Sequence, residues 1–446
     1  MNSKSPWVTD AQYDEKPDSS LNGNPLIEAV SVIMDPATIA HRLTRRAEVP
    51  KNFDEIPRLY RSTILEQLRN QHIPHPLSVP LYYKIVEKIL CGYRDKNPFS
   101  ANAQRRLHDI AEQGWTKPSE FNRNQITGRT TADSCVAHGP SGTGKTTTIR
   151  NVLHLIPQVI NHSEYGGSPF IQQQITWISL DFPSTPSFKS LALNFFEAVD
   201  NALGTDYRQQ WSNAKYKSVD DFLSGVQRVA AVHYIGLVHI DEIQWIKTYG
   251  TRSNCPNLIT IEALFNKLGI PCLLSCESNG MDVFQASGHA NSKKPPDFTT
   301  ARRMLSDHEY KFQGHYINDE AFTELFNAFF PNAITHDLII DHDFKKLFHY
   351  CTAGIPALIA KVAHLFHEYN QALPEPMPAI DLLRHVHQSQ GTSHESFLPA
   401  MRELVNAKPS GPKTKLKRGP NSRLPKPDPN QLPFLNPENP PSVSEE

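Results

Sequence analysis

The stretch Gly139-Pro140-Ser141-Gly142-Thr143-Gly144-Lys145-Thr146 decides the fold prediction, because it fits the pattern G-x-x-x-x-G-K-[ST]. The glycines of this pattern let the backbone wrap closely around phosphate groups and point its N–H groups at them. Lys145 can reach the β- and γ-phosphates of a nucleotide, and the hydroxyl of Thr146 can ligate Mg²⁺. We therefore predict a phosphate-binding loop at residues 139–147, including Thr147, with ATP and Mg²⁺ as cofactors.

The residues around the loop fit a strand that leads into it and a helix that leaves it. Residues 134–138 (Ser-Cys-Val-Ala-His) are short and mostly apolar, as expected of a strand buried in a parallel sheet. Residues 147–155 can form a helix whose N-terminus favours an anion. Strand, loop and helix together are the context that the phosphate-binding motif requires.

A second motif lies roughly a hundred residues further along the chain. Residues 234–242 form an apolar run that ends in two carboxylates, Asp241 and Glu242. This arrangement predicts charge at the carboxyl end of a strand, where open α/β sheets bind their ligands. We expect Asp241 to hold Mg²⁺ through water and Glu242 to activate the attacking water. The two motifs together predict an ATP site in which Lys145 and Glu242 are catalytic.

Length, charge and cysteine content limit the class of protein. The 446 residues suffice for two or three domains, and a formal net charge of -1 gives no bulk sign of nucleic-acid binding. The six cysteines are scattered in mostly apolar surroundings, which favours free thiols in a reducing cytoplasm over a metal site. Neither a signal peptide nor an apolar run near the roughly 18 residues of a membrane span is present in the sequence. We therefore expect a cytoplasmic protein with no membrane partner.

Composition changes along the chain predict five regions. Residues 1–24 and 407–446 are polar and contain many prolines, which predicts disorder at both ends. Residues 25–100 predict a small helical module that folds against the next domain, as a scaffold or as a partner-docking arm. Residues 101–316 alternate strands with helices and form the predicted nucleotide-binding core, whereas residues 317–406 are wholly helical.

The alternation in the core predicts a parallel sheet with helices on both faces. Besides the two motif strands, we expect strands at residues 174–180 and 271–276 and helices at residues 188–203 and 219–232. An inserted strand between the loop strand and the carboxylate strand is the arrangement of AAA+ and RecA-like ATPases, and a helical lid after the sheet is the AAA+ plan. The predicted fold class is α/β: an AAA+ P-loop NTPase with a helical N-terminal module, a helical lid and a basic disordered tail.

The residues that follow the phosphate loop carry a more specific resemblance. Residues 146–207 closely resemble TnsC, the AAA+ regulator of heteromeric cut-and-paste transposons, and more distantly its TniB relatives. Shorter matches extend the resemblance over about residues 24–405, at Asn24 to Ala29, Gly92 to Pro98, Leu237 to Gln244 and Thr352 to Pro356. The resemblance implies a homo-oligomeric ring or filament on double-stranded DNA in a bacterial nucleoid. It also implies that the protein joins a target-selection protein to transposase subunits and uses ATP hydrolysis to control insertion.

Three positions depart from the usual AAA+ pattern. The fourth strand ends in polar residues other than the usual asparagine or threonine; the sensor candidates there are Ser275, Glu277 and Ser278. Residues 354–357 of the lid contain no sensor arginine, and Lys361, one turn on, is a weak substitute. Hydrolysis is therefore expected to be slow and regulatory. The arginine that bridges subunits is either Arg302 or Arg303.

Two loops that face the central pore in ring-forming relatives are candidates for DNA contact. After the second strand, Thr185 and Ser187 can donate to phosphate and Lys189 adds charge. The loop after Glu242 mixes basic and aromatic residues and contributes Lys247 and Arg252. Each loop is equally compatible with an ordinary surface turn. Since the sequence contains no base-reading motif, binding should be largely independent of DNA sequence.

The tail and two other protein classes leave alternatives for the function. Residues 408–426 carry seven cations and no acid, which favours contact with nucleic acid or an acidic partner, or simple solubility.

The main alternative to a transposition regulator is an AAA+ replication initiator or helicase-loader-like ATPase, and the next is a signalling NTPase of the STAND type. An initiator would need a DNA-reading domain after the lid, and a STAND protein usually has a repeat array, for which the sequence shows no period. The identity of the target-selection partner, including RNA-guided targeting, stays open.

Overall fold

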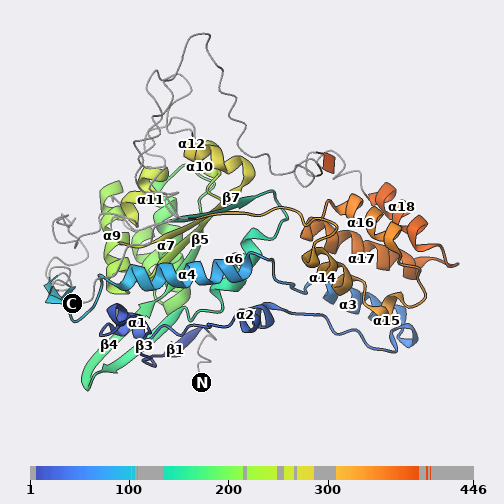
Figure 1. Cartoon of the computed structure of the whole chain (residues 1–446). Helices are drawn as coiled ribbons and strands as arrows, with labels where there is room; N and C mark the ends of the chain where they lie inside the picture. The colour runs from blue at the N-terminus through green and yellow to red at the C-terminus, as the bar shows by residue number, and fades with distance from the viewer. Residues whose placement is uncertain are drawn as a thin grey trace, which may run out of the picture. The chain divides into compact units, whose positions relative to one another are not determined.

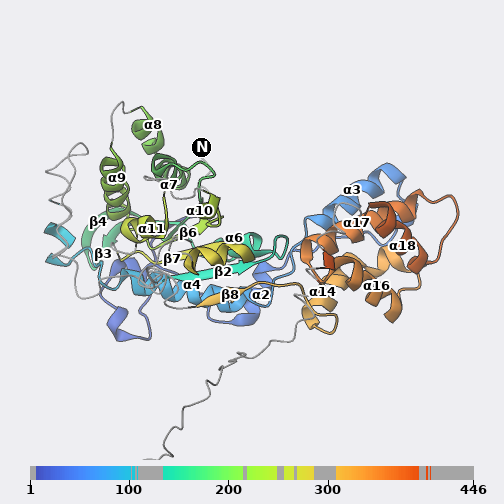
Figure 2. The ribbon, with the colours of Figure 1, turned by 90° about the horizontal axis from the view of Figure 1, so that it is seen from above.

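A computed structural model describes most of the chain between residues 7 and 390. The described residues are 7–101, 103–105, 108, 134–213, 218–248, 256–265, 269–285, 308–390, 398–399 and 402. They contain an α/β core and a helical lid, which Figures 1 and 2 show from two directions.

A five-stranded sheet forms the centre of the α/β core. Its order is β5 (Trp177–Asp181), β6 (Leu237–Asp241), β7 (Cys272–Glu277), β2 (Cys135–Gly139) and β8 (Glu309–Lys311). Every neighbouring pair in it is parallel, as predicted. The strand that lies between the two motif strands, β2 and β6, is β7, and β5 lies on the other side of β6.

Helices cover both faces of this sheet. The covering helices are α4 (Ser78–Tyr93), α6 (Lys145–Leu153), α7 (Phe188–Leu203), α9 (Val219–Val232) and α11 (Leu258–Leu264). The short helix α8 (Tyr207–Ser212) packs on α7, where Trp211 stacks on Phe196. Successive strand side chains point to opposite faces. On β2, Val136 accordingly joins one apolar core with α7 and α9, while Cys135 and Ala137 join the other with α4 and α6. Two independent cores therefore hold the strand ends in place, which is what a site at those ends requires.

A second, three-stranded sheet was not predicted. β1 (Val8–Asp10) pairs in parallel with β3 (Val159–Tyr165), and β3 pairs antiparallel with β4 (Ser168–Ile175). Gly166 and Gly167, with φ of 56° and 79°, form the tight turn between β3 and β4. A Gly-Gly pair between two strands is a hairpin signal, so the sequence did contain the information for this hairpin.

The prediction of disorder over residues 1–24 is wrong for residues 7–24. Besides the pairing of β1, the Trp7 ring stacks on His154 with the centroids 4.2 Å apart. Lys16 donates to the backbone carbonyls of Glu28 and Val30, at 3.2 and 3.0 Å. Polar composition suggested disorder, but these residues are ordered by contacts with nearby backbone carbonyls and with β3 and His154, far along the chain.

The helical region at residues 25–100 does not form one module. α1 (Pro25–Glu28), α2 (Pro36–Leu43) and α4 pack on the sheet core. α3 (Arg58–Arg69) instead packs against the lid helix α17 (Pro356–Ala372), and Figure 1 shows it beside α14 to α18. The apolar residues of α3 therefore find their partners in the lid, which composition did not indicate.

The lid is helical, as predicted. It contains α14 (Glu320–Phe329), α15 (Asn332–Thr335), α16 (His342–Thr352), α17 and α18 (Ala379–Gln390). Phenylalanines fill its centre: Phe322, Phe326, Phe329, Phe330, Phe344, Phe348 and Phe366.

The remaining short elements lie outside the lid sequence: η1 (Ser19–Leu21), η2 (Phe53–Glu55), α10 (Trp245–Thr248), η5 (Ser278–Met281) and α12 (Asp282–Gln285). Among the described helices, none has the length and apolar character needed to cross a bilayer.

Candidate nucleotide site

The predicted phosphate loop connects β2 directly to α6. Gly142 and Gly144 have φ of 81° and 88°, a left-handed conformation that glycine adopts without steric cost. A Cβ on Gly139 would lie 2.1 Å from the carbonyl oxygen of Phe312, so the close approach of the chain after β8 also requires glycine there. Within the described residues, no side chain caps the start of α6. The first backbone N–H groups of α6 are therefore suited to bind an anion.

Lys145 is held inside this loop. Its side chain is buried, and its Nζ donates to the carbonyl oxygens of Gly139 at 2.8 Å and Pro140 at 2.9 Å. Burial lowers the pKa of Lys145, while the nearby carboxylates Glu277 and Asp241 oppose this shift. The ammonium group thus lies where the motif requires a cation against phosphate.

The other loop residues divide between loop closure and exposed positions. Thr143 is fully buried and donates from Oγ1 to the carbonyl oxygen of Pro140 at 2.8 Å. The side chains of Ser141 and Thr147 are exposed. These two residues are therefore expected to contribute to phosphate binding through their backbone N–H groups.

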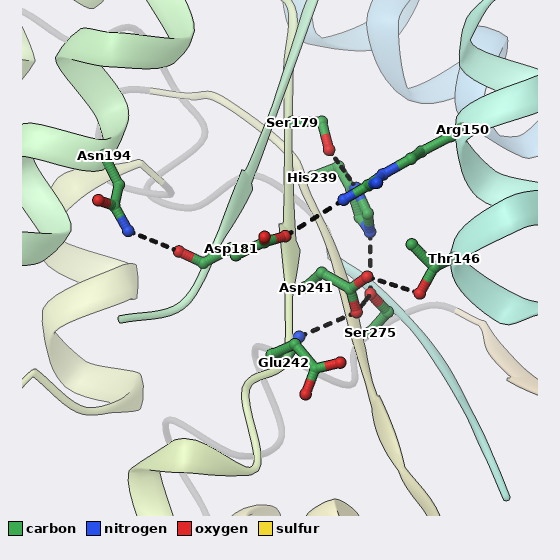
Figure 3. Close-up of polar contacts among 9 residues, drawn as sticks. All are labelled: Thr146, Arg150, Ser179, Asp181, Asn194, His239, Asp241, Glu242 and Ser275. Atoms are coloured by element: carbon green, nitrogen blue, oxygen red, sulfur yellow. Dashed lines mark hydrogen bonds and ion pairs between the residues drawn. The ribbon is translucent and has the colours of Figure 1, made fainter. Parts of the chain in front are cut away.

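Thr146 and Asp241, the two predicted metal ligands, are in direct contact (Figure 3). Thr146 Oγ1 donates to Asp241 Oδ2 at 2.7 Å. Burial by itself raises the pKa of Asp241, but His239 and the hydrogen bonds from Ser275 and Thr146 outweigh burial and lower this pKa below its usual range. An ionised carboxylate beside a hydroxyl is a set of hard oxygen donors, which Mg²⁺ prefers. The donor set therefore fits the predicted metal.

Glu242 follows Asp241 in a strained conformation. Its φ is 61°, which is uncommon for a non-glycine residue and marks functional sites. Its backbone N–H donates to Asp241 Oδ1 at 2.9 Å, and Gln244 Nε2 donates to Glu242 Oε2. Burial raises the pKa of Glu242, with further contributions from Asp241, Glu277 and Asp181. A carboxylate with a raised pKa is a better proton acceptor, as a general base requires.

The three sensor candidates lie in different places. Ser275 is fully buried on β7, and its hydroxyl donates to Asp241 Oδ1 at 2.5 Å. Glu277 ends β7, and its backbone N–H donates to Gln244 Oε1 at 3.3 Å. Ser278 is exposed in η5. Of the three, Ser275 contacts a site carboxylate directly, and sensor roles remain predictions.

His239 is a site residue that the sequence did not single out. It is fully buried on β6, its Nδ1 lies 2.8 Å from Ser179 Oγ, and its Nε2 lies 2.9 Å from Ser275 Oγ. Burial lowers the pKa of His239 to about 4. A polar residue two positions before Asp241 lies on the same face of the strand, and that spacing was the available signal.

Comparison with protein families identifies this region. A family model described as an AAA domain matches residues 128–278. The chain contains an AAA domain. The five-stranded parallel sheet, the N-terminal helical region and the helical lid give it the AAA+ fold.

The chain is also similar to several solved structures, each at low sequence identity. The chain is similar to the Walker-type ATPase PABY2304 of Pyrococcus abyssi, with a TM-score of 0.36 and 12% identity over 67% of this chain and 75% of that one. It is also similar to the Aeropyrum pernix ORC1 protein in complex with DNA, with a TM-score of 0.35 and 14% identity over 66% of each chain. Drosophila ORC bound to DNA gives a TM-score of 0.36 and 11% identity over 67% of this chain and 68% of that one. No curated protein sequence matches the chain.

The lid reaches the phosphate loop of the AAA domain through the start of α17. The Ala357 N–H donates to the carbonyl oxygen of Gly142 at 3.1 Å, and a Cβ on Gly142 would lie 3.3 Å from Ile355 Cγ2. The residues of the lid that contact Gly142 are thus apolar. Lys361 is half-buried one turn further along α17, and its sensor role stays a prediction.

The loop before α7 satisfies its own polar groups. Ser187 is the N-cap of α7 and accepts from the N–H of Ser190 at 3.4 Å, while Thr185 Oγ1 donates to Ser190 Oγ at 3.1 Å. Lys189 lies 6.0 Å from the centre of the Phe222 ring. These contacts hold the loop in shape, and DNA binding by it stays a prediction.

The second candidate loop is described only in part. Lys247, on α10, forms an ion pair with Asp282 at 2.8 Å and donates to the carbonyl oxygen of Asn279 at 2.9 Å. Arg252, Arg302, Arg303 and the tail at residues 407–446 lie outside the described residues.

Proposed function

We propose that this protein is an ATP-dependent DNA-binding regulator of DNA transposition. In this proposal it assembles as a homo-oligomer on double-stranded DNA of any sequence and joins a target-selection protein to transposase subunits. The ATPase part rests on the hydrogen bond between Thr146 and Asp241, 2.7 Å long, beside Glu242 at the carboxyl edge of the sheet. The transposition part rests on the resemblance of residues 146–207 to TnsC.

The chain's own residues divide the work of hydrolysis. The loop N–H groups and Lys145 bind the phosphates, and Thr146 and Asp241 would hold Mg²⁺, which supplies charge that offsets the phosphate oxygens. Glu242 accepts the proton of the attacking water, and Gln244 holds the Glu242 carboxylate in place through its hydrogen bond. Arg302 or Arg303 supplies a further cation from a neighbouring subunit.

The contact between lid and loop favours slow hydrolysis. Ala357 and Ile355 lie against Gly142, so this part of the lid brings no charge to the nucleotide. Removing one source of positive charge from a phosphoryl-transfer site slows the chemical step. In the proposed function, slow hydrolysis sets how long an assembly persists on DNA before it is released.

Electron microscopy of the full-length protein tests assembly. With a non-hydrolysable ATP analogue and duplex DNA of random sequence, we expect ordered oligomers on the DNA, and none with ADP. A pull-down with purified transposase subunits then separates the proposal from its alternative: a helicase loader would bind a replicative helicase instead. Failure to bind DNA in any nucleotide state would contradict both and favour a signalling NTPase.

A further inference from the structure

Three strands of the sheet carry a continuous line of polar side chains behind Asp241. Ser179, His239 and Ser275 lie on β5, β6 and β7, each two residues after an apolar residue that faces the α4–α6 core. Because strand side chains alternate, the three share that face of the sheet. Figure 3 shows the line running from Ser179 through the His239 ring to Ser275 and ending at Asp241.

The hydrogen at the Asp241 end of this line has only one possible position. An ionised carboxylate accepts hydrogen bonds and cannot donate them, so the Ser275 hydroxyl donates to Asp241 Oδ1. This bond joins a hydroxyl donor to a charged acceptor, the stronger kind of hydrogen bond. Since a hydroxyl has a single hydrogen, Ser275 Oγ must accept in its contact with His239, 2.9 Å away.

This assignment places a hydrogen on Nε2 of His239, because Nε2 is the atom that contacts Ser275 Oγ. The other ring nitrogen, Nδ1, lies 2.8 Å from the Ser179 hydroxyl, which completes the line. The two hydrogen bonds nearest the carboxylate therefore point in one direction, from His239 to Ser275 and from Ser275 to Asp241.

We propose that His239 is a positioning residue of the ATP site. Its Nε2–H holds Ser275 Oγ so that the serine hydroxyl is directed at Asp241 Oδ1, and the Glu242 N–H also donates to Oδ1. The other oxygen, Oδ2, is left facing Thr146. Outer hydrogen-bond partners of this kind orient carboxylates that hold metals. The inference rests on ATP and Mg²⁺ binding at this site and does not depend on the role in transposition.

Two substitutions at position 239 separate donation from packing. His239→Gln places an amide N–H near the position of Nε2 and keeps a donor toward Ser275. His239→Met has a similar length and volume but no donor. Ser275→Ala removes the link to Asp241, whereas Ser179→Ala removes only the far end of the line and serves as the matched control.

Metal binding is measured separately from hydrolysis. In the full-length protein with an ATP analogue, Mn²⁺ affinity is measured by electron paramagnetic resonance, and nucleotide affinity is measured with and without metal. We expect His239→Met and Ser275→Ala each to lower Mn²⁺ affinity about tenfold, with metal-free nucleotide affinity unchanged. The Mn²⁺ affinities of His239→Gln and Ser179→Ala should stay within about threefold of the wild-type affinity. The double variant His239→Met/Ser275→Ala should bind Mn²⁺ no more weakly than Ser275→Ala, because His239 acts on Asp241 through Ser275.

Nitrogen-15 NMR of histidine-labelled protein, assigned with His239→Gln, reports directly which ring nitrogens carry a hydrogen. A hydrogen on Nε2 supports the proposal, and an Nε2 without a hydrogen overturns it. Equal Mn²⁺ affinity in His239→Gln and His239→Met would overturn it as well. If His239→Met does not fold, the Mn²⁺ affinity of Ser275→Ala and the NMR measurement on His239 still test the proposal. Failure of the ATP site itself would appear in the wild type, as nucleotide binding that metal does not strengthen.

Discussion

Helices α6 and α7 both follow a parallel strand of the same sheet, but their first turns are built differently. α6 begins after Gly144, whose backbone is in the left-handed conformation, and no described side chain caps it. α7 starts after Ser187, whose Oγ accepts from the Ser190 N–H. Lys145 is buried in its own loop, whereas Lys189 is exposed beside Phe222.

The difference separates a ligand site from a self-contained turn. A helix N-terminus binds an anion only if its N–H groups are left without an internal acceptor. Glycine at the start of α6 leaves them so, while the serine at the start of α7 takes one of them. The ends of the neighbouring strands β6 and β5 differ in a similar way. Asp241 on β6 is buried. Asp181, its partner in register on β5, is exposed and forms an ion pair with Arg150 at 3.4 Å.

Glu242→Gln gives the largest expected effect. The amide cannot take the proton from water, so the hydrolysis rate should fall by about 10²–10⁴-fold while ATP affinity is kept. Steady-state phosphate release and nucleotide titration measure the two. Asp181→Asn, at the other strand end, is the control and should keep most of the rate. Hydrolysis by Glu242→Gln at the wild-type rate would remove Glu242 as the base.

Lys145→Ala should weaken ATP binding on the order of a hundredfold, because two charge-assisted interactions with phosphate oxygens are lost. Titration with a fluorescent ATP analogue measures the change. Lys189→Ala, at the start of α7, is the matched control and should leave ATP affinity unchanged. Equal effects of the two substitutions would show that the comparison of α6 with α7 is wrong.

Ser187→Ala should lower the free energy of unfolding by about 1 kcal/mol, since it removes the N-cap of α7. Urea denaturation followed by circular dichroism measures this, with Thr185→Ala as the control of smaller effect. If Ser187→Ala leaves stability unchanged but weakens DNA binding, Ser187 serves as a phosphate contact and not as a cap.

Lys189→Ala should weaken DNA binding only two- to threefold, by about one lost phosphate contact, and should lower the slope of log affinity against log salt by about 0.9. Lys345, on the lid, is the matched control, because its Nζ also lies over a phenylalanine ring, 5.0 Å from the centre of Phe326. Lys345→Ala should leave the slope unchanged. An unchanged slope in Lys189→Ala would remove this residue from the proposed DNA contacts.

The smallest effect concerns the pH dependence of hydrolysis. Asp181 contributes to the raised pKa of Glu242, so Asp181→Asn should lower that pKa. The base then stays deprotonated to lower pH, and the acid limb of the rate profile should move toward lower pH. A limb that moves up or stays in place would show that Glu242 does not control it.

Several elements followed from local signals alone. The helix predicted at residues 188–203 and the one at 219–232 have those bounds in the structure. The Gly166-Gly167 pair is also a local signal for a tight turn between two strands, but we did not predict the hairpin from it. By contrast, the separation of α3 from α1, α2 and α4 depends on contacts with the lid, roughly 300 residues further along the chain. No local pattern distinguishes an apolar helix face that meets one core from one that meets another.

The sequence by itself determined the phosphate loop, the Asp241–Glu242 pair and the AAA+ order of elements. It could do so because their chemistry depends on residues adjacent in the chain, where glycine conformation, a lysine and a strand end act together. Only the tertiary structure decided that Ser275, 34 positions after Asp241, donates to it and that His239 holds Ser275. These contacts are set by the order and register of three strands, which arise when both faces of the sheet are packed.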